Sequence, residues 1–178
     1  APALVSLTGN GVTDLVVGWG GGTLMYCKNT GTAVSPTFVM QTGSQNLFDG
    51  INVTAHSHPV FVDLDGDGDP DLVLGNKIGA LAYYENTGTP TNPSFALRTG
   101  NGNNPFASIL VGGDSAPSFT DLDHDGDFDL VVGQKDGGIL IYYENTGNLK
   151  SPTFTKRSGL NIDPFFGISL SSYSNPIF

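Results

Sequence analysis

An acidic nine-residue loop occurs twice in this chain and constrains its fold more than any other feature. The copies span Asp63–Asp71 and Asp121–Asp129, and each holds five aspartates at alternate positions. Carboxylates this close repel one another and resist packing against apolar groups, and a hard cation with oxygen ligands removes both problems. Each copy runs directly into an apolar segment, Leu72–Gly75 or Leu130–Gly133, that is typical of a strand. The pattern therefore predicts a cation-binding loop between two strands.

The spacing of the ligands favours calcium. Side chains at positions 1, 3 and 5 point to one centre, a glycine at position 6 permits the bend, position 7 offers a carbonyl, and position 9 closes the site, as in the first half of an EF-hand loop. Position 12 of an EF-hand is a glutamate on a helix, whereas here it is Leu74 or Val132 within a strand-like run. A solvated acidic turn is the alternative, and two copies in register argue against it. The predicted site residues are Asp63, Asp65, Asp67, Asp69 and Asp71, and Asp121, Asp123, Asp125, Asp127 and Asp129.

The loops belong to a longer repeat. Asp14, Asp71 and Asp129 recur at intervals of 57 and 58 residues, and an Asn-Thr-Gly motif follows each of them. The predicted repeats are residues 1–58, 59–116 and 117–175, with residues 176–178 opening a fourth.

Each repeat has the pattern of short strands. In the second repeat we expect strands at 59–63, 71–75, 80–86 and 94–98, followed by a less regular stretch over 105–113. No window shows the apolar period of a helix over ten residues. The predicted fold class is all-β, with three four-stranded antiparallel β-propeller blades and the start of a fourth, so the ring is incomplete in one chain.

The segment Phe61–Gly75 resembles an FG-GAP or VCBS-type repeat, the blade type of integrin alpha-chain propellers. The resemblance covers essentially the whole chain and is strongest in the second and third repeats. It implies calcium in the loop between the first two strands of a blade. The implied side-chain ligands are the first, third, fifth and ninth residues of each loop, while Asp69 and Asp127 supply carbonyl oxygens.

The first repeat departs from this pattern. Its loop has Ser6, Thr8 and Asn10 where the other loops have aspartates, and only Asp14 keeps a carboxylate. Neutral oxygens compensate poorly for the free energy lost when calcium is dehydrated, so we expect a third site here to be weak or absent.

Composition restricts the partners. The chain has 17 acidic and 7 basic residues, a formal charge of −10, and ten of the acids lie in the two loops. This excess of negative charge argues against nucleic acid and anionic lipid as binding partners. No apolar run is long enough to span a membrane. Exposed calcium loops without a helical frame suit an extracellular or cell-surface setting. Because Ala1 stands where a repeat opens, we expect a processed chain or a piece of a longer one.

Several other residues have an ordinary and a functional interpretation. Cys27 aligns with tyrosines of the later repeats, which favours a small buried side chain over a reactive thiol. The pair His56 and His58 is expected in a connecting loop rather than at a metal. We expect Trp19 to pack against a neighbouring blade, with sugar or protein stacking as the alternative. Asn52 opens a glycosylation sequon.

No catalytic constellation is recognisable, so we expect a non-enzymatic protein. The favoured function is a calcium-stabilised structural or adhesion module, such as a building block of a surface assembly or filament. The alternative is a carbohydrate-binding propeller similar to fungal lectins. Three blades do not close a ring. We therefore expect a longer propeller, a ring of several copies, or a filament in which residues 176–178 meet residues 2–4 of the next chain.

Overall fold

The computed structural model describes residues 1–9 and 11–178, which form three four-stranded antiparallel sheets. The first sheet comprises β1 (Pro2–Val5), β2 (Asp14–Gly18), β3 (Leu24–Asn29) and β4 (Phe38–Gln41). The second comprises β5 (His58–Val62), β6 (Asp71–Gly75), β7 (Leu81–Asn86) and β8 (Phe95–Arg98). The third comprises β9 (Ala116–Thr120), β10 (Asp129–Gly133), β11 (Leu140–Asn145) and β12 (Phe154–Arg157). Two single-turn 3-10 segments, η1 (Gly43–Gln45) and η2 (Asp136–Gly138), lie in connections.

The strands of each sheet follow one another in chain order, each paired with the next. The predicted all-β class and the four antiparallel strands of each repeat are confirmed, and the observed bounds in the second sheet differ from the expected ones by at most one residue. Among the described residues, no helical segment has the length and apolar content needed to cross a bilayer.

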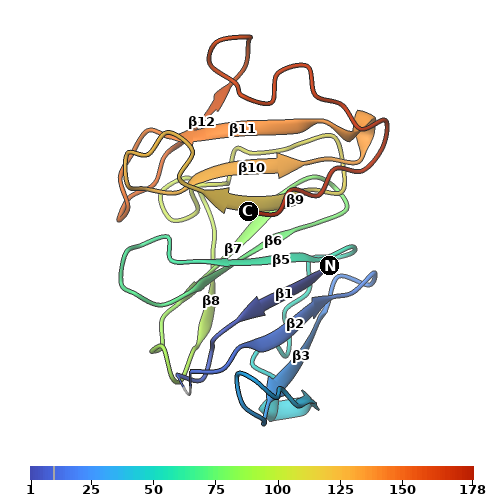
Figure 1. The fold of residues 1–178 in the computed structure, drawn as a ribbon, viewed down its shortest axis with the longest axis vertical. Helices are drawn as coiled ribbons and strands as arrows, with labels where there is room; N and C mark the ends of the chain where they lie inside the picture. The colour runs from blue at the N-terminus through green and yellow to red at the C-terminus, as the bar shows by residue number, and fades with distance from the viewer. Residues whose placement is uncertain (10) are drawn as a thin grey trace.

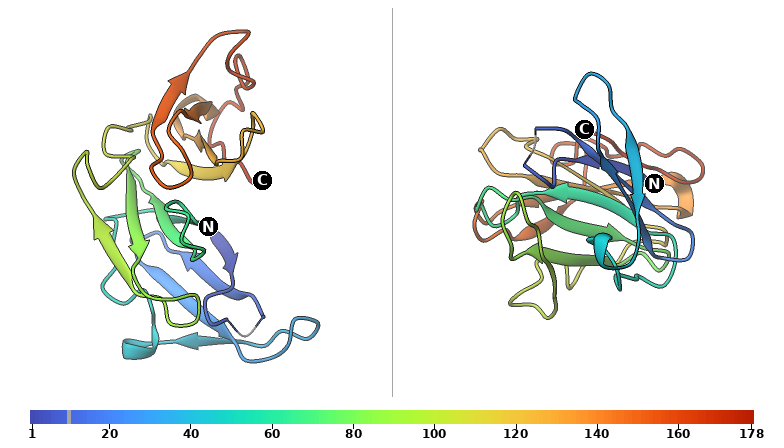
Figure 2. Two further views of the ribbon diagram at one scale, coloured as in Figure 1. Left: turned by 90° about the vertical axis from the view of Figure 1, so that its left-hand side faces the viewer. Right: turned by 90° about the horizontal axis from the view of Figure 1, so that it is seen from below.

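The three sheets succeed one another along the long axis of the molecule (Figure 1). Their first strands lie side by side, since β1 contacts β5 and β5 contacts β9. The left-hand view of Figure 2, turned by 90° about the vertical axis, shows the same succession of sheets. The second sheet is therefore covered on both faces, and every residue of β6 is buried.

Burial on both faces explains the unbroken apolar sequence of β6. Leu72 and Leu74 pack into a core shared with the first sheet, while Val73 between them packs into a core shared with the third. Side chains alternate between the faces of a strand, so a strand with two covered faces needs apolar residues at every position.

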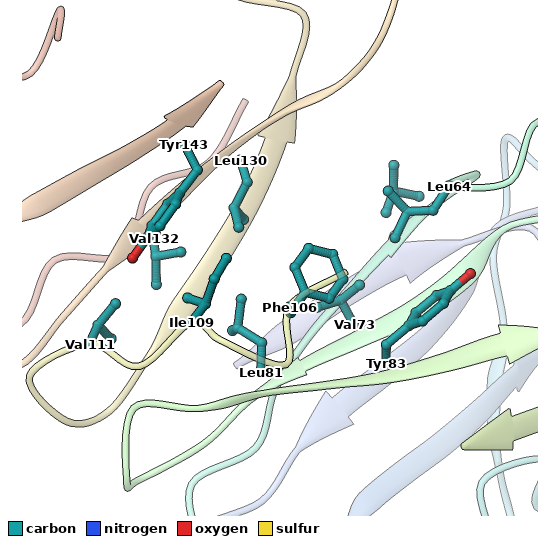
Figure 3. Close-up of a cluster of buried hydrophobic side chains, with 11 residues drawn as sticks. Leu64, Val73, Leu81, Tyr83, Phe106, Ile109, Val111, Leu130, Val132 and Tyr143 are labelled. Atoms are coloured by element: carbon teal, nitrogen blue, oxygen red, sulfur yellow. The ribbon is translucent and has the colours of Figure 1, made fainter. Parts of the chain in front are cut away.

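An aromatic ring from each connection fills the core between sheets. Phe106 lies between the second and third sheets, where it meets Tyr83 edge-on and stacks on Phe154 at a centroid distance of 5.0 Å. Figure 3 shows it among Val73, Leu130 and the other side chains of this core. Phe48 holds the matching position between the first and second sheets, where it stacks on Phe95.

A serine hydroxyl ties each connection to the preceding sheet. Ser115 Oγ donates to the Ala80 carbonyl at 2.8 Å and accepts from the Asn76 backbone N–H at 2.9 Å. Equivalent bonds are made by Ser57 and Ser174. The close approach requires a glycine at the end of the second strand, because a Cβ at Gly75 would lie 2.0 Å from the Ser115 carbonyl oxygen.

Candidate metal centre

The two acidic loops connect the first strand of a sheet to its second. The second loop (Asp63–Asp71) joins β5 to β6, and the third loop (Asp121–Asp129) joins β9 to β10. Gly68 and Gly126, at position 6, have φ of 94° and 98° with open space around them. This left-handed backbone favours glycine, so the bend predicted at position 6 is present in both loops.

In the second loop, one oxygen from each of Asp63, Asp65 and Asp67 lies within 4.8 Å of the others. Backbone N–H groups hold these carboxylates in place. Asp63 accepts from Gly66 at 2.8 Å and from Gly68 at 3.0 Å. Asp65 and Asp67 each accept from the N–H two residues further along, at 3.2 and 2.8 Å.

The third loop repeats the cluster with Asp121, Asp123 and Asp125, whose oxygens also lie within 4.8 Å of one another. Asp121 accepts from the Gly126 N–H at 3.2 Å. Asp123 and Asp125 each accept from the N–H two residues on, at 3.2 and 3.1 Å. The loops therefore orient three carboxylates in the same way, although they lie in different sheets.

Each loop has a further carboxylate, at its seventh position, that is buried. Asp69 is only 4% exposed and its Oδ1 has no hydrogen-bond partner, and the same is true of Asp127, which is 8% exposed. Burial, followed by the charges of Asp67 and Asp63, raises the pKa of Asp69. Burial likewise raises the pKa of Asp127. A buried anionic oxygen without a donor requires a cation or a proton, so these oxygens extend the predicted role of position 7 beyond its carbonyl.

The ninth residue of each loop faces the sheet. Asp71 is 1% exposed and accepts from the Leu64 N–H at 3.1 Å, the Tyr83 hydroxyl at 3.0 Å and the Asn86 N–H at 2.8 Å. Burial raises its pKa to about 6 although these bonds act in the opposite direction. Asp129 makes the same three kinds of contact. The metal-ligand role of position 9 stays a prediction, and its structural role is evident.

In the first loop (Ser6–Asp14), the ninth residue has the same structural role. Asp14 is fully buried and accepts from the Tyr26 hydroxyl at 3.1 Å and the Asn29 N–H at 2.7 Å. Thr8 Oγ1 is buried without a hydrogen-bond partner. Asn10 lies outside the described residues. A weak or absent third calcium site therefore stays a prediction.

The candidate metal ligands of the second and third loops fit calcium. They are all oxygens, at least three of them belong to carboxylates, and each site has a further buried carboxylate oxygen without a partner. Calcium takes six to eight oxygen ligands in flexible geometry, whereas the softer transition metals prefer nitrogen or sulfur. Among the described residues, the groups of three acidic side chains that could hold a metal ion lie in these two loops.

Similar cavities lie beside both loops. One of about 470 Å³ has Asp65, the ion pair Glu85–Arg98 and Lys150 in its wall. The other, of about 660 Å³, has Asp123 and the ion pair Glu144–Arg157. Lys28 and Gln41 occupy the corresponding positions of the first repeat, so the paired charges are confined to the repeats with acidic loops.

The remaining candidates lie away from the loops. Cys27 is buried, in agreement with its ordinary interpretation. His56 Nδ1 pairs with Asp114 in the connections between sheets. The expectation for Trp19 is wrong, because its side chain is 65% exposed in the β2–β3 turn rather than packed against a neighbouring sheet. Trp19 lines a surface pocket together with Met25 and Met40.

Two sets of structural residues were missed by the sequence reasoning. The asparagines of the Asn-Thr-Gly motif were noted only as a repeat, yet Asn86 Oδ1 accepts from the N–H groups of Gly88 and Ser94 and so shapes the β7–β8 turn. The serines that tie the connections, such as Ser115, also recur once per repeat. Recurrence was the available signal, but only the fold shows their contacts.

Residues 63–132 match the family model described as FG-GAP-like repeat. The match begins at the first aspartate of the second loop and ends in β10, directly after the third loop. It therefore includes both clusters of three carboxylates.

Proposed function

The chain carries an FG-GAP-like repeat over residues 63–132, and on that premise we propose that it is a non-enzymatic, calcium-stabilised structural module. In this proposal the three sheets are blades of a β-propeller, each acidic loop holds one calcium ion, and the module works outside the cell in adhesion or surface assembly. The repeat family suggests a propeller-type module, and the adjacent first strands of the sheets support that arrangement.

The observation that carries the proposal is the presence of two clusters of three carboxylates. Each cluster lies in a loop that also has a buried, unpartnered carboxylate oxygen, Asp69 Oδ1 or Asp127 Oδ1. Charges that repel one another in the metal-free protein cost folding free energy. An ion that binds the native loop and not the unfolded chain removes this cost and adds its binding free energy to stability.

Thermal unfolding in calcium and in chelator tests the proposal. At a free calcium concentration about a hundredfold above the dissociation constant, the gain is about 2.7 kcal/mol per site. The melting temperature should rise with calcium and return to its starting value with chelator. A melting temperature that is the same in both conditions would contradict calcium stabilisation.

The uncovered faces support assembly with further blades. Each core ring inside the chain meets aromatic rings of the next sheet, as Phe48 meets Phe61 and Phe95. At the third sheet, Phe165 meets Phe178, which matches Phe61, but among the described residues it meets no ring in the place that Phe95 holds against Phe48. We expect the missing sheet to come from another copy, in a ring or filament, or from a longer polypeptide.

The mass of the native particle tests this assembly. Sedimentation in calcium should show species heavier than the 18.6 kDa chain. Deleting residues 175–178 should weaken the association, since it removes Phe178 and exposes an unpaired strand edge. A monodisperse monomer at micromolar concentration would contradict assembly from copies of this chain.

Carbohydrate binding is the second candidate, and the repeated cavities beside the loops favour it. Each contains a bidentate ion pair, such as Arg98 with Glu85, that offers fixed donors and acceptors to hydroxyl groups. A glycan array should then show binding that the double variant Arg98→Ala/Arg157→Ala loses and Gln41→Ala retains. An array without any bound glycan would remove this candidate.

A further inference from the structure

The second acidic loop lies beside a turn from the next sheet. Gly66, the fourth residue of the second loop, has φ of 70°, and a Cβ placed on it would lie 3.2 Å from Lys150 Cγ and 3.3 Å from Leu149 Cγ. Lys150 and Leu149 belong to the β11–β12 turn of the third sheet. Leu149 and Asp63 of the loop also line the same small pocket. The turn therefore lies directly against the second loop.

The same contact occurs one repeat earlier. Gly9 holds the fourth position of the first loop with φ of 59°, and a Cβ there would lie 2.2 Å from Thr91 Cγ2. Thr91 belongs to the β7–β8 turn of the second sheet. Two occurrences at matching positions show that the contact is a regular feature of neighbouring sheets in this chain.

The third loop differs at this position. It carries His124, with φ of 62°, where the other loops have glycine. His124 is exposed, and so is Asp123 beside it, whereas the corresponding Asp65 is half-buried. The second and third loops thus have identical aspartates at their five ligand positions and different surroundings.

We propose that the β11–β12 turn is the outer wall of the second calcium loop, so that residues of the third sheet set part of the affinity of a site in the second. The inference rests on the proposed calcium binding. A covered loop has fewer conformations to lose when the ion binds, and its carboxylates act in a medium less screened by water. In a single chain, whose third loop has no such wall, the second loop therefore binds calcium more tightly than the third.

The coupling also gives the ion an effect beyond its own loop. Because binding and wall contact stabilise each other, calcium in the second loop holds the second and third sheets together. Lys150 then stays in the wall of the cavity that also contains Asp65. Loss of calcium releases both sides of that cavity together.

Single-site proteins allow the test by calcium titration calorimetry. Asp123→Asn leaves only the second loop able to bind calcium, and this variant is called the second-loop protein. Asp65→Asn leaves only the third loop able to bind calcium, which gives the third-loop protein. The second-loop protein should bind more tightly. Leu149→Ala should weaken its binding roughly fivefold, within the usual range of coupling between sites. The same substitution should leave the third-loop protein unchanged. Thr91→Ala is the matched control, since it uncovers the first loop and should change neither constant.

A second variant protects the test from a folding defect at Leu149. Gly66→His copies the third loop, whose backbone accepts histidine at a similar φ, and displaces the turn. It should bring the affinity of the second-loop protein down to that of the third-loop protein. Equal affinities in the two single-site proteins, or no effect of Gly66→His, would overturn the inference alone. Absence of calcium binding in both would overturn the proposed function as well.

Discussion

Asp14 keeps its carboxylate in a loop whose other ligand positions carry no aspartate. The structure explains this, because Asp14, like Asp71 and Asp129, accepts hydrogen bonds from a tyrosine hydroxyl and a backbone N–H of the third strand. The position therefore serves the sheet whether or not the loop holds an ion. The sequence placed these aspartates correctly in the repeat but assigned them only to calcium, since their hydrogen-bond donors lie about one hairpin away.

Substitution of Asp14 separates the two roles. Asp14→Ala leaves the buried Tyr26 hydroxyl and the Asn29 N–H without an acceptor, at a cost of about 1–3 kcal/mol for each group. Urea unfolding should show this loss equally in calcium and in chelator. Thr8→Ala is the control and should be close to neutral, because Thr8 Oγ1 has no partner. A loss seen only in calcium would show that the aspartate acts through an ion.

His58 makes stability depend on pH. Burial is the main cause that lowers its pKa, with contributions from the N-terminal amine and His56, while Asp114 acts in the opposite direction. The folded protein therefore binds fewer protons than the unfolded chain just below the unperturbed value of 6.5, and stability falls as the pH falls through this region.

Replacing His58 by alanine, the residue at the matching position Ala116 of the third sheet, should reduce that dependence. The measurement is the urea midpoint at about pH 7 and about pH 5, where an imidazole changes its charge. Wild type should lose more stability between these values than His58→Ala. Identical losses would show that His58 titrates alike in the folded and unfolded states.

At the scale of the strands and turns, local sequence patterns predict most of the secondary structure. The alternation of apolar runs with Gly, Asn, Asp and Pro located the strands of the second sheet within one residue. It did not reveal the wall contact of Gly66 with Leu149, because these residues are far apart in sequence and meet only when sheets pack. The exposure of Trp19 was missed for the same reason, since it depends on which face of the first sheet is covered.

The glycine at the end of each second strand offers a test of how the sheets are joined. Gly75→Ala would place a Cβ 2.0 Å from the Ser115 carbonyl oxygen and 2.8 Å from Pro117 Cδ. Both contacts involve fixed backbone or a proline ring, so we expect a loss of about 3 kcal/mol or more. Gly102→Ala, in open space, should stay within about 0.5 kcal/mol of wild type. Comparable unfolding midpoints for the two variants would contradict this packing.

At the scale of the whole molecule, the second sheet connects the first sheet to the third. It contributes to both hydrophobic cores, its loop contacts the turn of the third sheet, and its own turn contacts the first loop. The repeat length predicted three similar units, and the two hydrophobic cores join each unit to its neighbour. Ions in the second and third loops would thus act on a continuous structure.

Counting bound ions by native mass spectrometry in calcium tests the central claim most directly. The wild-type chain should carry two calcium ions. Asp65→Ala and Asp123→Ala should each carry one, because each loses a central carboxylate of its cluster. Thr8→Ala should still carry two, since the first loop lacks the charges that calcium requires. A wild-type chain without bound calcium, or one that holds three ions tightly, would contradict the account.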